Sequence, residues 1–182
     1  MSSNDHTQYR AGTSIGLLPG DILTACDNEL NVPTGYLGHS AIAVDERHIV
    51  EAVISYPYIQ LASKESFFSP HPLCAVYRPK DPSWGTAAAR CAYDYFLKSR
   101  EHLQKGTVLP PFSFDLNVAL DDPWTSVYCS KLVWLSYHFG VGYTLPNDFG
   151  LFTPEDLDYN LSRDPNFILV YKHPGFQFLI DS

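Results

Sequence analysis

The sequence lacks any run of basic residues. Its 182 residues contain 12 Lys and Arg against 20 Asp and Glu, which gives a formal net charge of −8. A surface that binds nucleic acid or an anionic membrane needs clustered positive charge. We therefore expect no nucleic-acid partner.

Long apolar segments are also missing. No window approaches the roughly 18 consecutive apolar residues that would indicate an integral membrane segment. The polar residues 1–16 lack the features of a signal peptide and are predicted to form a flexible arm before a single domain at residues 17–182. These absences predict a soluble protein of the cytoplasm.

Cysteine is sparse, and its spacing excludes the common metal sites. The four cysteines, at positions 26, 74, 91 and 129, form no C-x-x-C pair and no zinc-type pairing with histidine. We expect reduced thiols, no metal and no cofactor. The sequence leaves the oligomeric state open.

Short apolar runs between turn-forming residues predict a set of strands. They lie at residues 21–26, 38–44, 48–54, 58–62, 74–78 and 167–171. Helical periodicity predicts a helix from Thr86 to about Leu103, a second from residues 127–129 to Gly140 or Gly142, and a short third helix from Thr153. The fold class predicted is α+β, with helices packed on a small, mainly antiparallel sheet or barrel.

His39 and Glu51 lie in neighbouring predicted strands, joined by a turn at residues 45–47. If Val44 opposes His48, Glu51 lies diagonally across from His39 on the same face, about 7–8 Å away at the backbone. A carboxylate there could orient the imidazole. A two-residue turn would instead put the two side chains on opposite faces, and two solvent-facing polar residues are the plainer alternative.

Cys129 stands at the predicted start of an apolar helix. A helix N-terminus lowers the pKa of a thiol, and its free N–H groups can stabilise an oxyanion. His138, on the same helix, lies too far along it to act as the base, so a base must come from elsewhere in the fold. The other histidines are assigned no role. Cys26, Cys74 and Cys91 are predicted to be structural, and a buried structural thiol is the alternative for Cys129 itself.

Several segments taken in order resemble a known family. They are Leu18–Leu23, Gly38-His39-Ser40, Val50-Glu51-Ala52, Pro111–Asp115, Val127–Trp134 and Phe152–Leu157. Together they resemble the circularly permuted NlpC/P60 group of the papain-like superfamily, the YiiX/YaeF-like proteins, with lecithin retinol acyltransferase as a more distant relative. The resemblance covers roughly residues 15–172.

The resemblance implies a permuted papain-like fold with Cys129 as nucleophile, His39 as general base and Glu51 as the orienting residue. It also implies that Tyr128 and Lys131 line the substrate site. The family commonly has Glu where Lys131 stands, so Lys131 either changes the substrate end of the cleft or faces solvent. The expected activity is a cysteine hydrolase that cleaves a peptide-like or lipid-bearing amide, or an acyl bond, through a thioester. An acyltransferase and a binding module without turnover are the alternatives.

Overall fold

The computed structural model describes residues 14–27, 37–147 and 150–179. The predicted arm at residues 1–16 lies almost entirely outside these ranges. Within them, no helix is both long and apolar enough to cross a membrane.

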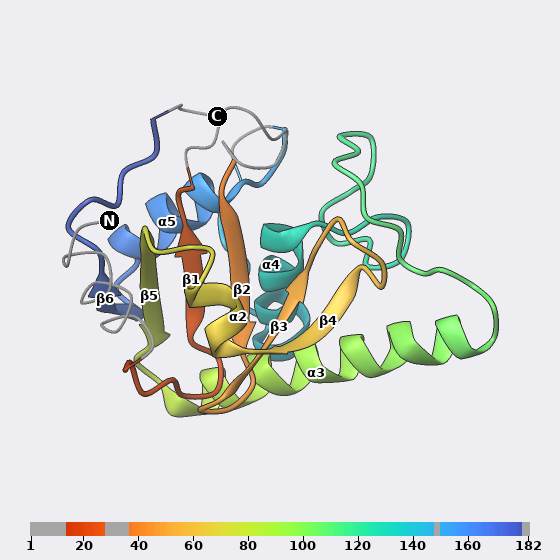
Figure 1. The fold of residues 1–182 in the computed structure, drawn as a ribbon, viewed down its shortest axis with the longest axis horizontal. Helices are drawn as coiled ribbons and strands as arrows, with labels where there is room; N and C mark the ends of the chain where they lie inside the picture. Colours follow the sequence, from red (N-terminus) through yellow and green to blue (C-terminus); the bar gives the residue numbers. More distant parts are fainter. Residues whose placement is uncertain (1–13, 28–36, 148–149, 180–182) are drawn as a thin grey trace.

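The described strands form one open, six-stranded antiparallel sheet (Figure 1). Its strands are β1 (Ile22–Ala25), β2 (His39–Ala43), β3 (His48–Ala52), β4 (Ile59–Ser63), β5 (Cys74–Pro79) and β6 (Phe167–Lys172). They are arranged in the order β4-β3-β2-β1-β5-β6, so β4 and β6 are edges and the sheet does not close into a barrel. The predicted strands and the α+β class are confirmed.

Four helices are described: α2 (Lys64–Phe68), α3 (Pro82–Gln104), α4 (Cys129–Val141) and α5 (Pro154–Arg163). The predicted start of α3 at Thr86 was wrong, because Asp81 accepts a hydrogen bond from the Ser83 amide and Pro82 occupies the first turn. The short helix α2 was not predicted at all.

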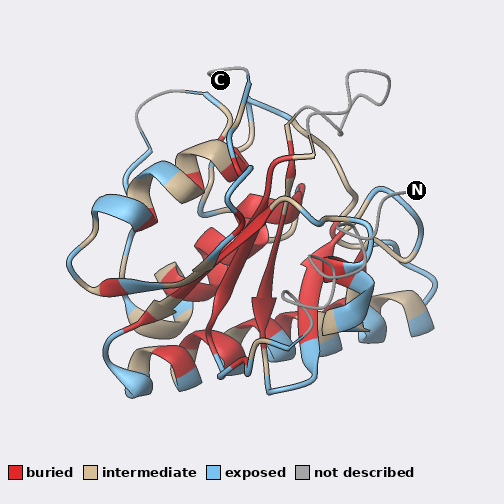
Figure 2. Ribbon diagram, turned by 60° about the vertical axis from the view of Figure 1, so that its left-hand side comes forward, coloured by how far each residue is buried: buried red, intermediate tan, exposed pale blue. Residues whose placement is uncertain are grey.

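The sheet separates two hydrophobic cores, because successive side chains of a strand point to opposite faces. On one face, residues such as Ile22 and Ile42 pack with helices α3, α4 and α5. On the other, Leu23 and Ala41 pack with Phe67 of α2. The central strands are therefore buried on both sides (Figure 2).

Helix α4 is the centre of the larger core. Every residue from Cys129 to Tyr137 is buried. The Tyr137 hydroxyl donates a hydrogen bond of 2.7 Å to the carbonyl of Gly20, which connects α4 to the segment just before β1. Gly20 has a φ of 84°, and a Cβ on it would lie 2.3 Å from the Cα of Gly85, so α3 also passes close to this point.

The residue after Gly20 fixes the same corner. Asp21 is fully buried, accepts a hydrogen bond from the Leu18 amide, and is paired with the Arg78 guanidinium at 2.8 and 2.6 Å. Through Gly20 and Asp21, the Leu18–Leu23 segment connects α4 with β1 and with the end of β2.

Candidate active site

The β2–β3 hairpin brings His39 and Glu51 into direct contact. Ile42 is paired with Val50 and Ala43 with Ile49, which is the register that the predicted three-residue turn requires. The two residues therefore share a face, and His39 Nε2 lies 2.6 Å from Glu51 Oε2. The two side chains are only 13% and 9% exposed, so the pair is shielded from water.

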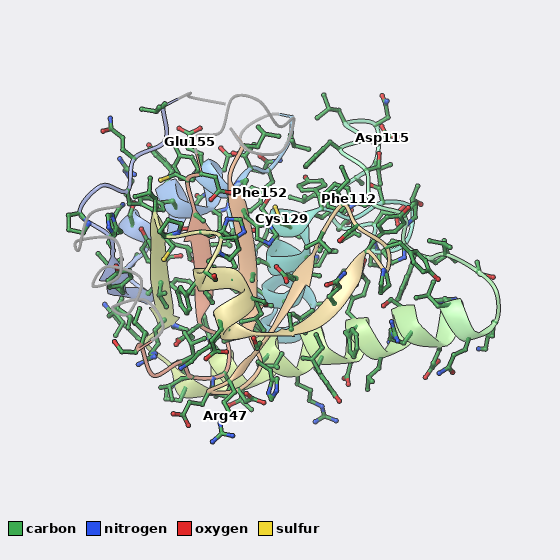
Figure 3. All side chains as sticks on the ribbon, in the orientation of Figure 1. Arg47, Phe112, Asp115, Cys129, Phe152 and Glu155 are labelled. Atoms are coloured by element: carbon green, nitrogen blue, oxygen red, sulfur yellow. The ribbon has the colours of Figure 1, made fainter. Side chains whose placement is uncertain are left out.

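Strands β2 and β3 separate beyond the Ile42–Val50 pair. From there β2 stays paired with β1, with His39 opposite Ala25, while Glu51 is paired with Gln60 of β4. The start of helix α4 lies at this end of the sheet, where Figure 3 shows Cys129, and the Arg47 turn lies at the opposite end.

Cys129 is the first residue of α4, and no side chain caps this end of the helix. Tyr128 occupies the cap position in an extended conformation without a capping hydrogen bond from its side chain, and the first turn contains no acidic residue. A helix start with free N–H groups and no neutralising carboxylate favours an anion. The Ser130 amide donates a hydrogen bond that lowers the pKa of Cys129.

The imidazole and the thiol are coupled. Burial acts to raise the pKa of Cys129, but the hydrogen bond and charge of His39 outweigh it and bring the pKa below its ordinary value. Burial acts to lower the pKa of His39, but hydrogen bonds with Cys129 and Glu51 raise it to about 10. Both shifts favour a thiolate–imidazolium pair.

Glu51 and Cys129 contact different nitrogens of the His39 ring. Because Nε2 of His39 is bound to Glu51, Nδ1 is the nitrogen available to the sulfur. The Ser40 hydroxyl also lowers the pKa of Cys129, although no atom meets it with the geometry of a full hydrogen bond.

A second histidine–carboxylate pair lies beside His39 and was missed from the sequence. The His71 ring centroid is 4.9 Å from that of His39, and His71 Nδ1 is 2.7 Å from Asp27 Oδ1. The Phe67 ring stacks on His39 with a centroid distance of 5.6 Å and lies tilted against His71 at 5.1 Å. No spacing rule predicts a partner 44 positions away.

Lys131, predicted to line the substrate site, points into the protein. It is 1% exposed, and its Nζ donates a hydrogen bond of 3.1 Å to the Ala119 carbonyl. Burial lowers the pKa of its ammonium group, while Asp122 and Asp121 act to raise it. In the described structure Lys131 therefore fastens the connector between α3 and α4.

Tyr128 is also largely buried, at 4% exposure. Its hydroxyl accepts a hydrogen bond of 3.3 Å from the Phe152 amide, and its ring contacts Phe114. The Ser130 hydroxyl donates to the Phe152 carbonyl at 2.6 Å, so the residues before and after Cys129 both bind the backbone of Phe152. Figure 3 shows Phe152 and Cys129 at the same end of the molecule.

The pKa values of the other three cysteines are shifted in the opposite direction to that of Cys129. Burial raises the pKa of Cys26, of Cys91 and, to about 12, of Cys74. All four cysteines are free. Cys91 is more exposed than Cys129 but has a raised pKa, so in these two thiols greater exposure and lower pKa do not coincide.

Comparison with known proteins identifies the architecture. A crystal structure of the metalloprotein yiiX from Escherichia coli O157:H7 matches with a TM-score of 0.58 and 14% identity, covering 87% of this chain and 99% of that one. The chain has a YiiX-like fold. No protein-family model and no curated protein matches the sequence.

The yiiX structure is named a metalloprotein. Across the described ranges, no three His, Cys, Asp or Glu side chains are grouped to hold a metal ion.

Proposed function

We propose that the protein is a cysteine hydrolase of the permuted papain-like type, which cleaves an amide or acyl bond through a thioester. The observation that carries this proposal is the arrangement of one imidazole between a carboxylate at 2.6 Å and a helix-terminal thiol of lowered pKa. The order along the chain, with the histidine strand before the cysteine helix, is the reverse of papain and agrees with a permuted relative.

The mechanism follows from these positions. His39 Nδ1 takes the proton of the Cys129 thiol, and the thiolate attacks the substrate carbonyl. The N–H groups at the start of α4 stabilise the oxyanion that forms. The imidazolium gives its proton to the leaving amine or alcohol as the C–N or C–O bond breaks, which leaves a thioester on Cys129. Water, deprotonated by His39, then attacks the thioester and releases the acid and the free thiol.

Glu51 acts through His39. Its carboxylate accepts a hydrogen bond from the Nε2–H of His39, which keeps Nδ1 directed at the sulfur and stabilises the imidazolium. The low exposure of the pair strengthens this effect, because charges interact more strongly away from water.

The test is site-selective alkylation with a limiting amount of iodoacetamide, followed by peptide mapping. If accessibility governed the rate, Cys91 would react before Cys129, since Cys129 is only 5% exposed. We expect Cys129 to react first and to lose this advantage in His39→Ala. Labelling of Cys91 before Cys129, or labelling of Cys129 that does not change in His39→Ala, would refute the proposal.

A turnover assay distinguishes hydrolysis from its alternative. We expect wild-type protein, but not Cys129→Ser, to release p-nitrophenol from p-nitrophenyl acetate continuously in water. Release limited to one equivalent, resumed only when an alcohol or amine acceptor is added, would assign the thioester to acyl transfer instead.

A further inference from the structure

A buried hydroxyl without a hydrogen-bond partner directly follows His39 in the chain. It belongs to Ser40, which is 0% exposed, and among the described residues no atom forms a hydrogen bond with its Oγ. A hydroxyl that is removed from water and left unpaired costs free energy, so its presence at this position calls for an explanation.

Ser40 points to the face of the sheet that α4 covers. It stands two positions before Ile42 on β2, and Ile42 packs in the same core as Leu132 of α4. Because side chains alternate along a strand, Ser40 shares the face of Ile42, whereas the His39 side chain leaves the strand on the other face, toward Phe67. The hydroxyl and the imidazole therefore approach the start of α4 from different directions.

Three donors act on the sulfur of Cys129. Burial acts to raise the pKa of this thiol, and the imidazole of His39, the hydroxyl of Ser40 and the amide of Ser130 act to lower it. A thiolate is a strong hydrogen-bond acceptor, whereas the sulfur of a neutral thiol is a weak one. The Ser40 hydroxyl thus gains a good partner only when the sulfur is an anion.

We propose that Ser40 is a further catalytic residue, whose hydroxyl donates a hydrogen bond to the Cys129 sulfur whenever that sulfur carries a negative charge. The inference rests on the proposed function and adds one donor to its nucleophile. Since the partner exists only in the charged state, the cost of burying the hydroxyl becomes a preference for the thiolate over the thiol.

The same hydrogen bond serves two steps of the reaction. In the resting protein it increases the fraction of Cys129 that is present as thiolate. In the second half of the reaction, water that has given a proton to His39 adds its oxygen to the thioester carbon, and the C–S bond then breaks with its electron pair going to sulfur. Ser40 donates to the sulfur as this charge appears, which makes the thiolate a better leaving group.

Thr24 provides a matched control on the neighbouring strand. It is paired directly with Ser40 in the register of β1 and β2, so the two side chains share a face of the sheet. Its hydroxyl is equally buried, and in the part of the chain that the structure describes it also has no hydrogen-bond partner. Helix α4 contacts β1 less closely than β2. Thr24→Val therefore removes a comparable hydroxyl that lies on a strand farther from the helix of Cys129.

The test is the rate of Cys129 alkylation by iodoacetamide between pH 5 and 10. A hydrogen bond to a charged group corresponds to about one to two pKa units. In Ser40→Ala we expect the rise of the rate with pH to lie about one unit higher than in wild-type protein, with a rate about tenfold slower on the rising part of the profile. Thr24→Val should keep the wild-type profile, and Ser40→Thr, which retains a hydroxyl, should restore it.

A second measurement separates catalysis from folding. In a Cys129→Ala background the Ser40 hydroxyl has no anion to bind, so the additional Ser40→Ala change breaks no hydrogen bond. The urea concentration at the unfolding midpoint should then stay the same or rise. A lower midpoint in the double variant would show that the hydroxyl supports the fold, and the inference would be wrong.

The outcomes also separate the role of Ser40 from the catalytic proposal. An alkylation profile that is unchanged in Ser40→Ala, or that changes equally in Thr24→Val, overturns the role of Ser40; the hydrolase stands as long as His39→Ala still slows Cys129. If Cys129 of the wild-type protein reacts no faster than Cys91, both proposals fail.

Discussion

Replacing Glu51 with glutamine isolates the contribution of the carboxylate. The substitution keeps the size of the side chain and a hydrogen-bond acceptor for His39 Nε2, but removes the negative charge. Because the carboxylate is bound at 2.6 Å and is 9% exposed, its charge is poorly screened by water. We expect the imidazolium, and with it the Cys129 thiolate, to become less stable.

The magnitude follows from Coulomb's law. Two unit charges about 4 Å apart interact by about 4 kcal/mol at an effective dielectric constant near 20, which corresponds to about three pKa units as an upper limit. The remaining amide hydrogen bond and the Cys129 partner retain part of this effect. We therefore expect the pKa of His39 to fall from about 10 by roughly one to two units in Glu51→Gln.

The assay is the rate of Cys129 alkylation by iodoacetamide between pH 5 and 10, followed by intact-mass spectrometry. In wild-type protein the rate should rise at a pH below the ordinary thiol range, because the pKa of Cys129 is lowered. In Glu51→Gln the part of the profile where His39 loses its proton should move from about pH 10 to lower pH by roughly one to two units.

Glu46→Gln is the control, because it removes the same charge from an exposed position of the same hairpin. It should leave the profile unchanged. If Glu51→Gln and wild type alkylate with the same rate and pH dependence, Glu51 only fills space beside His39, and the reasoning fails.

Further predictions concern the surroundings of the site. His71→Ala should slow Cys129 alkylation by about two- to tenfold through the loss of an aromatic contact with His39, and His71→Phe should restore the rate; equal rates would deny the contact a role. Hydrolysis of an amide, whose leaving amine must be protonated, should decline as the pH rises through about 10, because His39 then loses its proton; a constant rate to pH 11 would contradict this. Lys131→Glu should lower the free energy of unfolding in urea by about 3–5 kcal/mol, because it buries a carboxylate against the Ala119 carbonyl, whereas Lys131→Met should cost only about 1 kcal/mol. Leu132→Ala should cost about 2–5 kcal/mol by leaving a cavity in the larger core, and a smaller loss would show that α4 can repack.

The relative placement of His39 and Glu51 could be predicted from the sequence, because it depends only on how many residues separate each of them from the turn. Side chains alternate along a strand, so the register of one hairpin decides whether His39 and Glu51 share a face. The interruption of an apolar run by Glu51 was a further signal, since a buried carboxylate needs a partner. The same holds for the position of Cys129, which periodicity placed at a helix start.

The rest depends on contacts between distant segments. Nothing in the sequence pairs Asp27 with His71, because the two meet only after β1 and the segment after α2 are folded against the same sheet. The family resemblance placed Lys131 at the substrate end of the site, but the connector folds over it and offers a carbonyl oxygen. The helix α2 has five residues, which is too short for periodicity to reveal.

The burial of α4 from Cys129 to Tyr137 has a consequence for how the protein would lose the proposed activity and how that activity would diversify. The sulfur is attached to a helix buried over its first nine residues, so on heating its chemistry should vanish in the same transition as the fold rather than before it. New specificities would then arise in the β3–β4 loop and the connector, which can change sequence while the scaffold that holds the thiol stays the same.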